Sequence, residues 1–149
     1  MSLEDWSRNG WIEKHESRPE EIEQFLLAAD EDICDAELIC LSADWRHNIA
    51  YNAALRCATA ALAASGYRVR REMHQYRTIQ SLPLTIGSEM HDVCACLDKA
   101  RKSRAEAVYQ RSGVISDAMA DEILELAKRL RKQVEAWLRN NHPHLVKEN

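Results

Sequence analysis

Apolar residues recur at the spacing of a helix face along most of this chain, and this spacing is what most constrains its fold. The clearest example follows Ser116, where seven apolar residues three or four positions apart would share one face. They are Ala120, Ile123, Leu124, Ala127, Leu130, Val134 and Leu138. No alternating apolar run and no repeat of fixed period is evident in the sequence. The pattern predicts an all-α protein, and strands are not expected.

Five helices are expected from the apolar spacing and from residues that favour helix ends. They span about residues 17–40, 45–64, 67–87, 88–112 and 116–138. Ser17 and Glu20 have the spacing of a capping box, with Pro19 in the first turn of that helix. Gly66 is placed to end the second helix in the left-handed conformation, and Ser116 should cap the fifth.

The second helix is expected to be the central one, because apolar residues lie on two of its sides and its many alanines permit close neighbours. The architecture is therefore a single up-and-down bundle of about five helices. Residues 1–16 should form an N-terminal arm whose two tryptophans pack on the domain. Residues 17–140 should form the bundle domain, and residues 141–149 a frayed tail.

Composition favours one protein domain in the cytoplasm, without a membrane span. The chain has 149 residues, 46% of them hydrophobic and 30% charged, which is ordinary for a helical domain. Its five cysteines lie in apolar helical segments without a secreted framework pattern, so they are expected to be reduced core residues. No signal peptide is recognised, and the longest uncharged run, residues 57–67, is too short to cross a bilayer.

Charge is unevenly distributed along the chain. The net charge of −4 argues against a protein that coats nucleic acid, and no Lys or Arg occurs between Arg18 and Arg46, where nine acidic residues fall. Positive charge gathers in two segments, at Arg68, Arg70, Arg71 and Arg77 and at Lys99, Arg101, Lys102, Arg104 and Arg111. Either these segments lie together as an anion-binding surface, or they pair with the acidic helix.

Two arginines interrupt the apolar face of the helix expected at 88–112. Arg101 and Arg104 fall on the same stripe as Cys94 and Leu97, one turn apart. A guanidinium aimed toward a core needs a partner, a ligand or water. The arrangement therefore indicates either a phosphate or RNA site or a pair of structural ion pairs, and closed ion pairs away from any pocket would count against a site.

Several segments in order resemble proteins of the HEPN superfamily. They are the acidic first helix, AYNAALRCATAALAASGYR, RREMHQYRTIQSL, and RKSRAEAVYQRSGVISDA leading into the last helix, together covering about residues 17–138. The resemblance implies a helical bundle, usually a dimer with its site at the dimer interface, found in prokaryotic toxin and defence systems. Many such proteins are metal-independent ribonucleases with an Arg, four to six residues and a His. Some operate beside a nucleotidyltransferase partner.

Carried onto this chain, the motif arginine is Arg104, and Tyr109 stands where the histidine is expected. This departure matters, because an ordinary tyrosine has its pKa near 10 and is a poor general base near neutral pH. Tyr109 could still orient a phosphate, donate a proton or accept a nucleotidyl group. Arg101 and Lys102 would add ligand contacts.

A second Arg-to-His spacing joins Arg68 to His74, with five residues between them. His74 and Arg77 are kept as further ligand-binding candidates that could face Arg104, against the alternative of a histidine bonded to backbone. No metal or other cofactor is expected. The nearest ligand patterns are Asp44 with His47, and Cys94 with Cys96, which would face apart on a helix.

Two hypotheses follow for function. In the first, a HEPN-like homodimer binds RNA or a nucleotide through its arginine cluster and is a metal-independent ribonuclease of a toxin or defence system. In the second, the same fold is a non-catalytic dimeric interaction protein, the partner of a nucleotidyltransferase.

Overall fold

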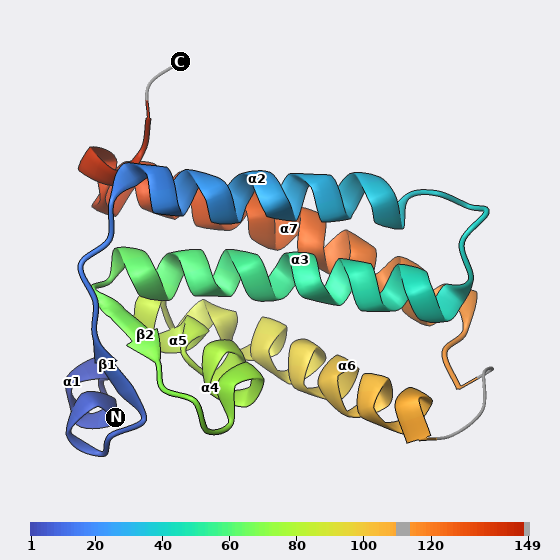
Figure 1. Ribbon diagram of the computed structural model, residues 1–149, viewed down its shortest axis with the longest axis horizontal. Helices are drawn as coiled ribbons and strands as arrows, with labels where there is room; N and C mark the ends of the chain where they lie inside the picture. The colour runs from blue at the N-terminus through green and yellow to red at the C-terminus, as the bar shows by residue number, and fades with distance from the viewer. Residues whose placement is uncertain (110–113, 148–149) are drawn as a thin grey trace.

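The computed structural model describes residues 1–109 and 114–147, without the side chains of residues 106–109. Four long helices form an all-α bundle, as the sequence predicts (Figure 1). They are α2 (Pro19–Ala36), α3 (Ala43–Ala64), α6 (His91–Tyr109) and α7 (Asp117–Asn141). The short helices are α1 (Leu3–Arg8), α4 (His74–Gln80) and α5 (Leu82–Thr85), with 3₁₀ turns η1 (Ser88–Met90) and η2 (Pro143–Leu145).

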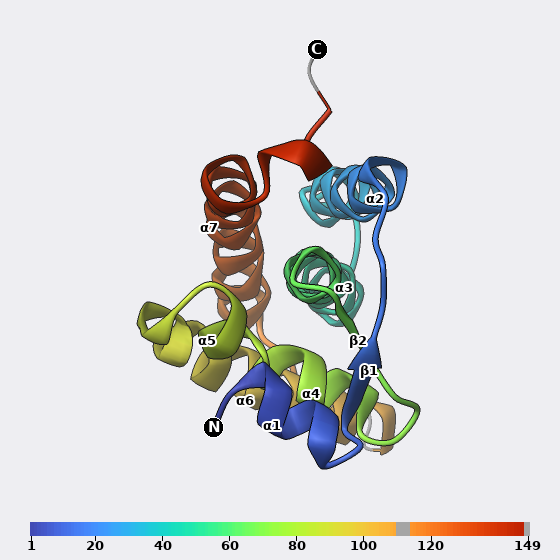
Figure 2. The ribbon, with the colours of Figure 1, turned by 90° about the vertical axis from the view of Figure 1, so that its left-hand side faces the viewer.

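Helix α3 lies at the centre of the bundle, as predicted. Helices α2 and α7 pack on one side of it, and α4 and α6 lie on the other (Figure 2). Seven alanines between Ala50 and Ala63 are buried on this helix, so its neighbours can approach closely. Gly66 follows with φ +93°, the left-handed conformation expected after the helix end.

The apolar face of α7 supplies much of the main core. All seven residues of its predicted stripe are buried against the neighbouring helices. Ser116 caps this helix as predicted, because its hydroxyl accepts a hydrogen bond from the N–H of Met119 at 3.1 Å.

A short antiparallel ribbon corrects the prediction that the chain has no strands. Strand β1 (Ile12–Lys14) pairs with β2 (Tyr67–Val69), with Ile12 opposite Val69. Ile12 is buried beside Trp6 and Leu62 in a second, smaller apolar cluster. Three-residue strands alternate too briefly to give a sequence pattern, and the two partners are far apart in the chain.

The single helix expected at 67–87 is also wrong, because this segment forms β2, α4 and α5 in succession. Met73 precedes α4 with φ +52°, a left-handed conformation that prevents one continuous helix from running through this segment. Pro83 lies in the first turn of the separate helix α5, which begins at Leu82. A helix over 67–87 would turn Met73, Ile79 and Leu82 inward; Ile79 and Leu82 are buried, but Met73 is 58% exposed.

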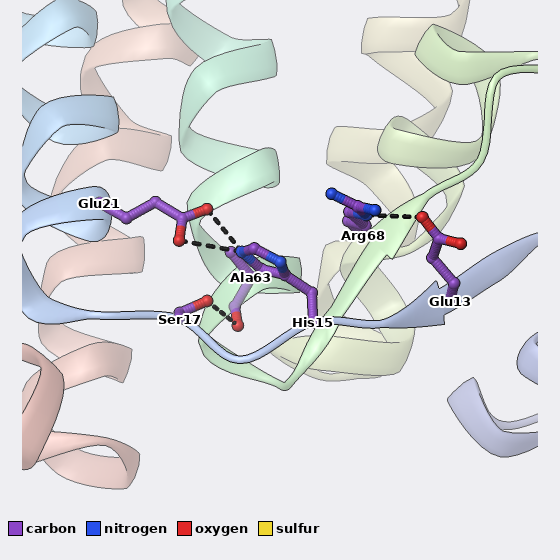
Figure 3. A network of polar contacts seen from close by, with 6 residues as sticks. All are labelled: Glu13, His15, Ser17, Glu21, Ala63 and Arg68. Carbon is purple, nitrogen blue, oxygen red and sulfur yellow. Dashed lines mark hydrogen bonds and ion pairs between the residues drawn. The ribbon is translucent and has the colours of Figure 1, made fainter.

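The linker before α2 is fastened to the end of α3 (Figure 3). The Ser17 hydroxyl donates a 2.6 Å hydrogen bond to the carbonyl of Ala63 instead of capping α2, so the predicted capping box is absent. His15 Nε2 lies 2.7 Å from the carboxylate of Glu21. These contacts hold β1, and with it the preceding arm, against the bundle.

Two further expectations differ from the structure. Residues 143–147 do not fray, because Leu145 is buried and Lys147 forms an ion pair with Glu23 at 2.9 Å. Residues 148–149 lie outside the described residues.

Of the five cysteines expected in the core, only Cys57 and Cys94 are buried, whereas Cys34, Cys40 and Cys96 are exposed. Over the described part of the chain, no helix has both the length and the apolar character needed to cross a membrane.

Candidate functional site

An open pocket with a volume of about 430 Å³ lies between α4 and α6. It joins residues 73–76, which lie within the first basic segment but are not its arginines, to Arg101 and Arg104 of the second. Its lining residues are Met73, His74, Gln75, Tyr76, Arg101, Arg104 and Ala105. We call this the Arg104 pocket.

Arg104 is partly buried and lies against an aromatic ring instead of a carboxylate. Its guanidinium carbon is 5.4 Å from the ring centroid of Tyr51 on α3, a cation–π contact. Among the described residues, no Asp or Glu forms an ion pair with Arg104. The charge of this arginine therefore contacts an aromatic face and is not neutralised by a carboxylate among the described side chains.

Tyr51 contacts Arg104 from beneath the pocket, and the sequence analysis did not identify it. Its side chain is fully buried, and its hydroxyl donates a 2.9 Å hydrogen bond to Oε1 of Gln75. Burial raises the pKa of Tyr51 to about 12, although the nearby charge of Arg104 acts in the opposite direction. The phenol therefore stays protonated. The available signal was a lone tyrosine in a helix otherwise rich in alanine.

Arg101 lines the same pocket but has an internal partner. It forms an ion pair with Asp98 at 3.0 Å and lies 5.4 Å above the ring of Tyr76. Lys102 also pairs with Asp98, at 3.3 Å, and does not line the pocket. Partial burial by itself raises the pKa of the Asp98 carboxyl, but hydrogen bonds from Arg101 and Lys102 outweigh it and lower that pKa below its usual value.

The remaining predicted residues are divided among different places. His74 is exposed and lines the Arg104 pocket, so the structure brings these two candidates together. Arg77, one helical turn further on, instead stacks over Trp11 at 3.8 Å and lines a second pocket. The side chain of Tyr109 lies outside the described residues. Arg68 forms an ion pair with Glu13, away from His74.

The acidic helix α2 does not neutralise the basic segments within the described residues. Its carboxylates pair with cations of other parts of the chain, on α3, α7, the linker and the tail: Arg56, Lys128, Arg131, His15 and Lys147. Helix α2 also lies across α3 from α4 and α6 (Figure 2). Of the two readings left open by the sequence, the contacts favour a separate basic surface on the side of α4 and α6.

Metal ligands do not gather in the described part of the chain, where no group of three or more His, Cys, Asp or Glu side chains could hold an ion. Cys94 and Cys96 do face apart, one buried and the other exposed. The Arg104 pocket instead offers a guanidinium, an imidazole, an amide and a phenol. These groups are suited to binding a phosphate through hydrogen bonds and charge.

Comparison with protein-family models, curated proteins and solved structures found no match. The HEPN resemblance therefore stays a prediction, and the chemistry of the Arg104 pocket has to be inferred from its own residues.

Proposed function

We propose that this protein is a HEPN-like helical domain that binds RNA or a nucleotide through the Arg104 pocket. The observation that carries the proposal is the state of Arg104, which lines an open pocket and has no carboxylate partner among the described residues. An always-charged guanidinium with free N–H donors is a strong phosphate ligand. Its place over the ring of Tyr51 fixes its direction before a ligand arrives.

In its catalytic form, the proposal is metal-independent RNA cleavage by a homodimer of a toxin or defence system. The 2′-hydroxyl of one nucleotide attacks the adjacent phosphorus and gives its proton to a water molecule. The bond from phosphorus to the 5′-oxygen breaks, and that oxygen leaves with a proton. Arg104 stabilises the negative charge on the cyclising phosphate, and Tyr109 positions the phosphate or supplies the proton.

The alternative is a non-catalytic interaction protein, the partner of a nucleotidyltransferase. The tyrosine at the expected position of the motif histidine favours it, because an ordinary phenol is a poor base near neutral pH. In this form the Arg104 pocket binds a nucleotide or RNA without cleaving it.

The test is an RNA-binding and RNA-cleavage assay in the presence of a metal chelator. It compares the wild type with Arg104→Ala, Tyr109→His and the control Arg18→Ala, which removes an exposed arginine at the start of α2. Cleavage that is lost only in Arg104→Ala supports the ribonuclease. Binding without cleavage, with cleavage gained in Tyr109→His, supports the non-catalytic form. Wild-type protein that neither binds nor cleaves RNA or nucleotides overturns the proposal.

A further inference from the structure

A second pocket lies on the other side of α4 and has a volume of about 770 Å³. Four arginines and two glutamates are among its lining residues, with Trp11 beside them. We call it the Arg70 pocket, after the first of the three arginines that carry the argument: Arg70, Arg71 and Arg77. Neither the family resemblance nor the proposed function assigns any role to it.

The ribbon of β1 and β2 builds this pocket. Alternation along β2 turns Val69 inward and leaves Arg68 and Arg70 exposed on the opposite face. The N–H of Arg70 donates to the carbonyl of Trp11 at 3.1 Å, which continues the pairing of the two strands by one residue. The guanidinium of Arg77, from α4, stacks over the Trp11 ring at 3.8 Å. The N-terminal arm therefore holds two of the arginines in place.

The charges in the Arg70 pocket are only partly balanced. Arg68 donates a 2.6 Å hydrogen bond to Glu13, so this pair is closed. Arg70, Arg71 and Arg77 form no ion pair with any Asp or Glu in the described ranges, although Glu72 also lines the pocket.

Pairing is otherwise common in this protein. Seven arginines form ion pairs with described carboxylates: Arg8, Arg46, Arg56, Arg68, Arg101, Arg131 and Arg139. The arginines without such a partner among the described residues include the three of the Arg70 pocket and Arg104. Gathering like charges costs free energy unless an anion offsets them, so the grouping points to an anionic ligand.

The two pockets are neighbours, because one short segment lines both. Residues 68–72 and Arg77 face the Arg70 pocket, and residues 73–76 face the Arg104 pocket. The left-handed turn at Met73 lies between them. Each pocket also has an aromatic side chain, Trp11 in one and Tyr76 in the other. Unpaired cations interleaved with aromatic rings are the arrangement by which proteins hold single-stranded nucleic acid.

We propose that Arg70, Arg71 and Arg77 form a second phosphate-binding site, which together with the Arg104 pocket holds successive phosphates of one single-stranded nucleic acid. This inference rests on the proposed function, because it takes the Arg104 pocket to bind a phosphate. Guanidinium groups supply paired N–H donors to each phosphate, and the rings contact the bases.

The test measures the affinity of the full chain for fluorescent RNA by anisotropy over a range of salt concentrations. The ligands are a dinucleotide and a single strand of about 10 nucleotides, a length that single-strand-binding domains cover. The variants are Arg70→Gln/Arg71→Gln, Arg104→Gln and the control Arg18→Gln. All of these side chains except Arg104 are exposed, and circular dichroism verifies that each variant folds.

The expected result is a loss that depends on ligand length. The double variant should weaken binding of the longer RNA roughly tenfold and reduce the slope of log affinity against log salt by about 1.4, since each single-strand phosphate contact contributes about 0.7. Its dinucleotide affinity should match the wild type, whereas Arg104→Gln should weaken both ligands. Single-stranded DNA of the same length distinguishes a site that reads phosphates alone from one that also requires ribose.

Failure of this inference is distinct from failure of the proposed function. If the double variant behaves like Arg18→Gln while Arg104→Gln weakens both RNAs, the second site is overturned and the proposed function stands. If only the double variant weakens binding of the longer RNA, the Arg104 pocket is overturned as a phosphate site. The proposal that one nucleic-acid strand occupies both pockets is then overturned as well. Unchanged affinity in every variant overturns both.

Discussion

The guanidinium carbon of Arg104 lies 5.4 Å from the ring centroid of Tyr51, so a cation at the mouth of an open pocket rests on a fully buried aromatic ring. An aromatic face attracts a cation without accepting its hydrogen bonds, whereas a carboxylate would accept them. Arg104 therefore keeps its N–H donors for a ligand. Tyr51 in turn is held by its hydrogen bond to Gln75, which joins α3 to α4 beneath the same pocket.

Replacing Tyr51 should separate the role of its ring from that of its hydroxyl. Tyr51→Phe keeps the ring and loses the bond to Gln75, so the free energy of unfolding should fall by about 1 kcal/mol, with dinucleotide binding retained. Tyr51→Leu also removes the face under Arg104 and should weaken dinucleotide binding severalfold, beyond its cost in stability. Urea unfolding and a dinucleotide titration measure the two effects. Equal loss of affinity in both variants would contradict the role given to the ring.

Arg131 should contribute more to stability than Arg139, although both form ion pairs with Glu135. Its guanidinium makes two hydrogen bonds to Asp30 of α2, at 2.9 and 3.1 Å, and its side chain is only 16% exposed. Arg131→Ala should lower the free energy of unfolding by about 1–2 kcal/mol, the range for a charged hydrogen bond reduced by the exposure of Asp30. The matched control is Arg139→Ala, which removes an exposed arginine paired to Glu135 on the same helix.

That control should change stability by at most about 0.5 kcal/mol, as exposed ion pairs generally do. Chemical denaturation of both variants gives the comparison. A similar small effect in Arg131→Ala would mean that the contact between α2 and α7 depends on apolar packing alone.

Sequence periodicity predicted the long helices because apolar residues recur at helix spacing along each, most continuously in α7, which buries Leu130 and Val134. It failed at residues 67–87. The apolar residues there fit a helix, but the structure of the segment is set by the backbone conformation of one residue and by pairing with a distant strand. Met73 adopts a positive φ that no residue type there demands, and Val69 pairs with Ile12, which lies in the N-terminal arm. Contacts of this kind are set by tertiary structure, so a local pattern does not contain them.

The candidate site was predictable in part for the same reason. The position of Arg101 and Arg104 on an apolar stripe was visible, because one helix carries both. The different contacts of the two arginines were not visible. Asp98 forms an ion pair with Arg101, whereas Tyr51, from another helix, makes a cation–π contact with Arg104. The Arg70 pocket was visible only as a run of arginines, because Trp11 reaches it through the pairing of β1 with β2.

The five cysteines should divide into two classes of reactivity. Burial raises the pKa of Cys57 to about 12 and that of Cys94 to about 11, so these thiols stay protonated and shielded from reagents. The other three are exposed. A thiol-specific chromogenic reagent should label three cysteines of the native protein quickly and all five after unfolding in denaturant. In Cys96→Ser, the number of quickly labelled cysteines should fall by one. Fast labelling of all five cysteines in the native protein would contradict the burial of Cys57 and Cys94.

The buried imidazole of His47 should make the protein less stable in mild acid. Burial lowers the pKa of His47 below its ordinary value of about 6.5, and the charge of Arg104 adds to this effect while Asp44 opposes it. Because the folded pKa is the lower one, the unfolded chain binds more protons as the pH falls through 6.5, and stability is lost there and kept above it.

The free energy of unfolding, measured in urea from pH 8 to pH 5, should therefore fall for the wild type relative to His47→Gln. The difference should fall by at most about 1.4 kcal/mol for each pH unit between the two pKa values. His91→Gln is the matched control, since this imidazole is exposed at the start of α6. A constant difference between wild type and His47→Gln across this range would show that the imidazole gains its proton as readily in the folded chain as in the unfolded one, and would contradict its burial beside Arg104.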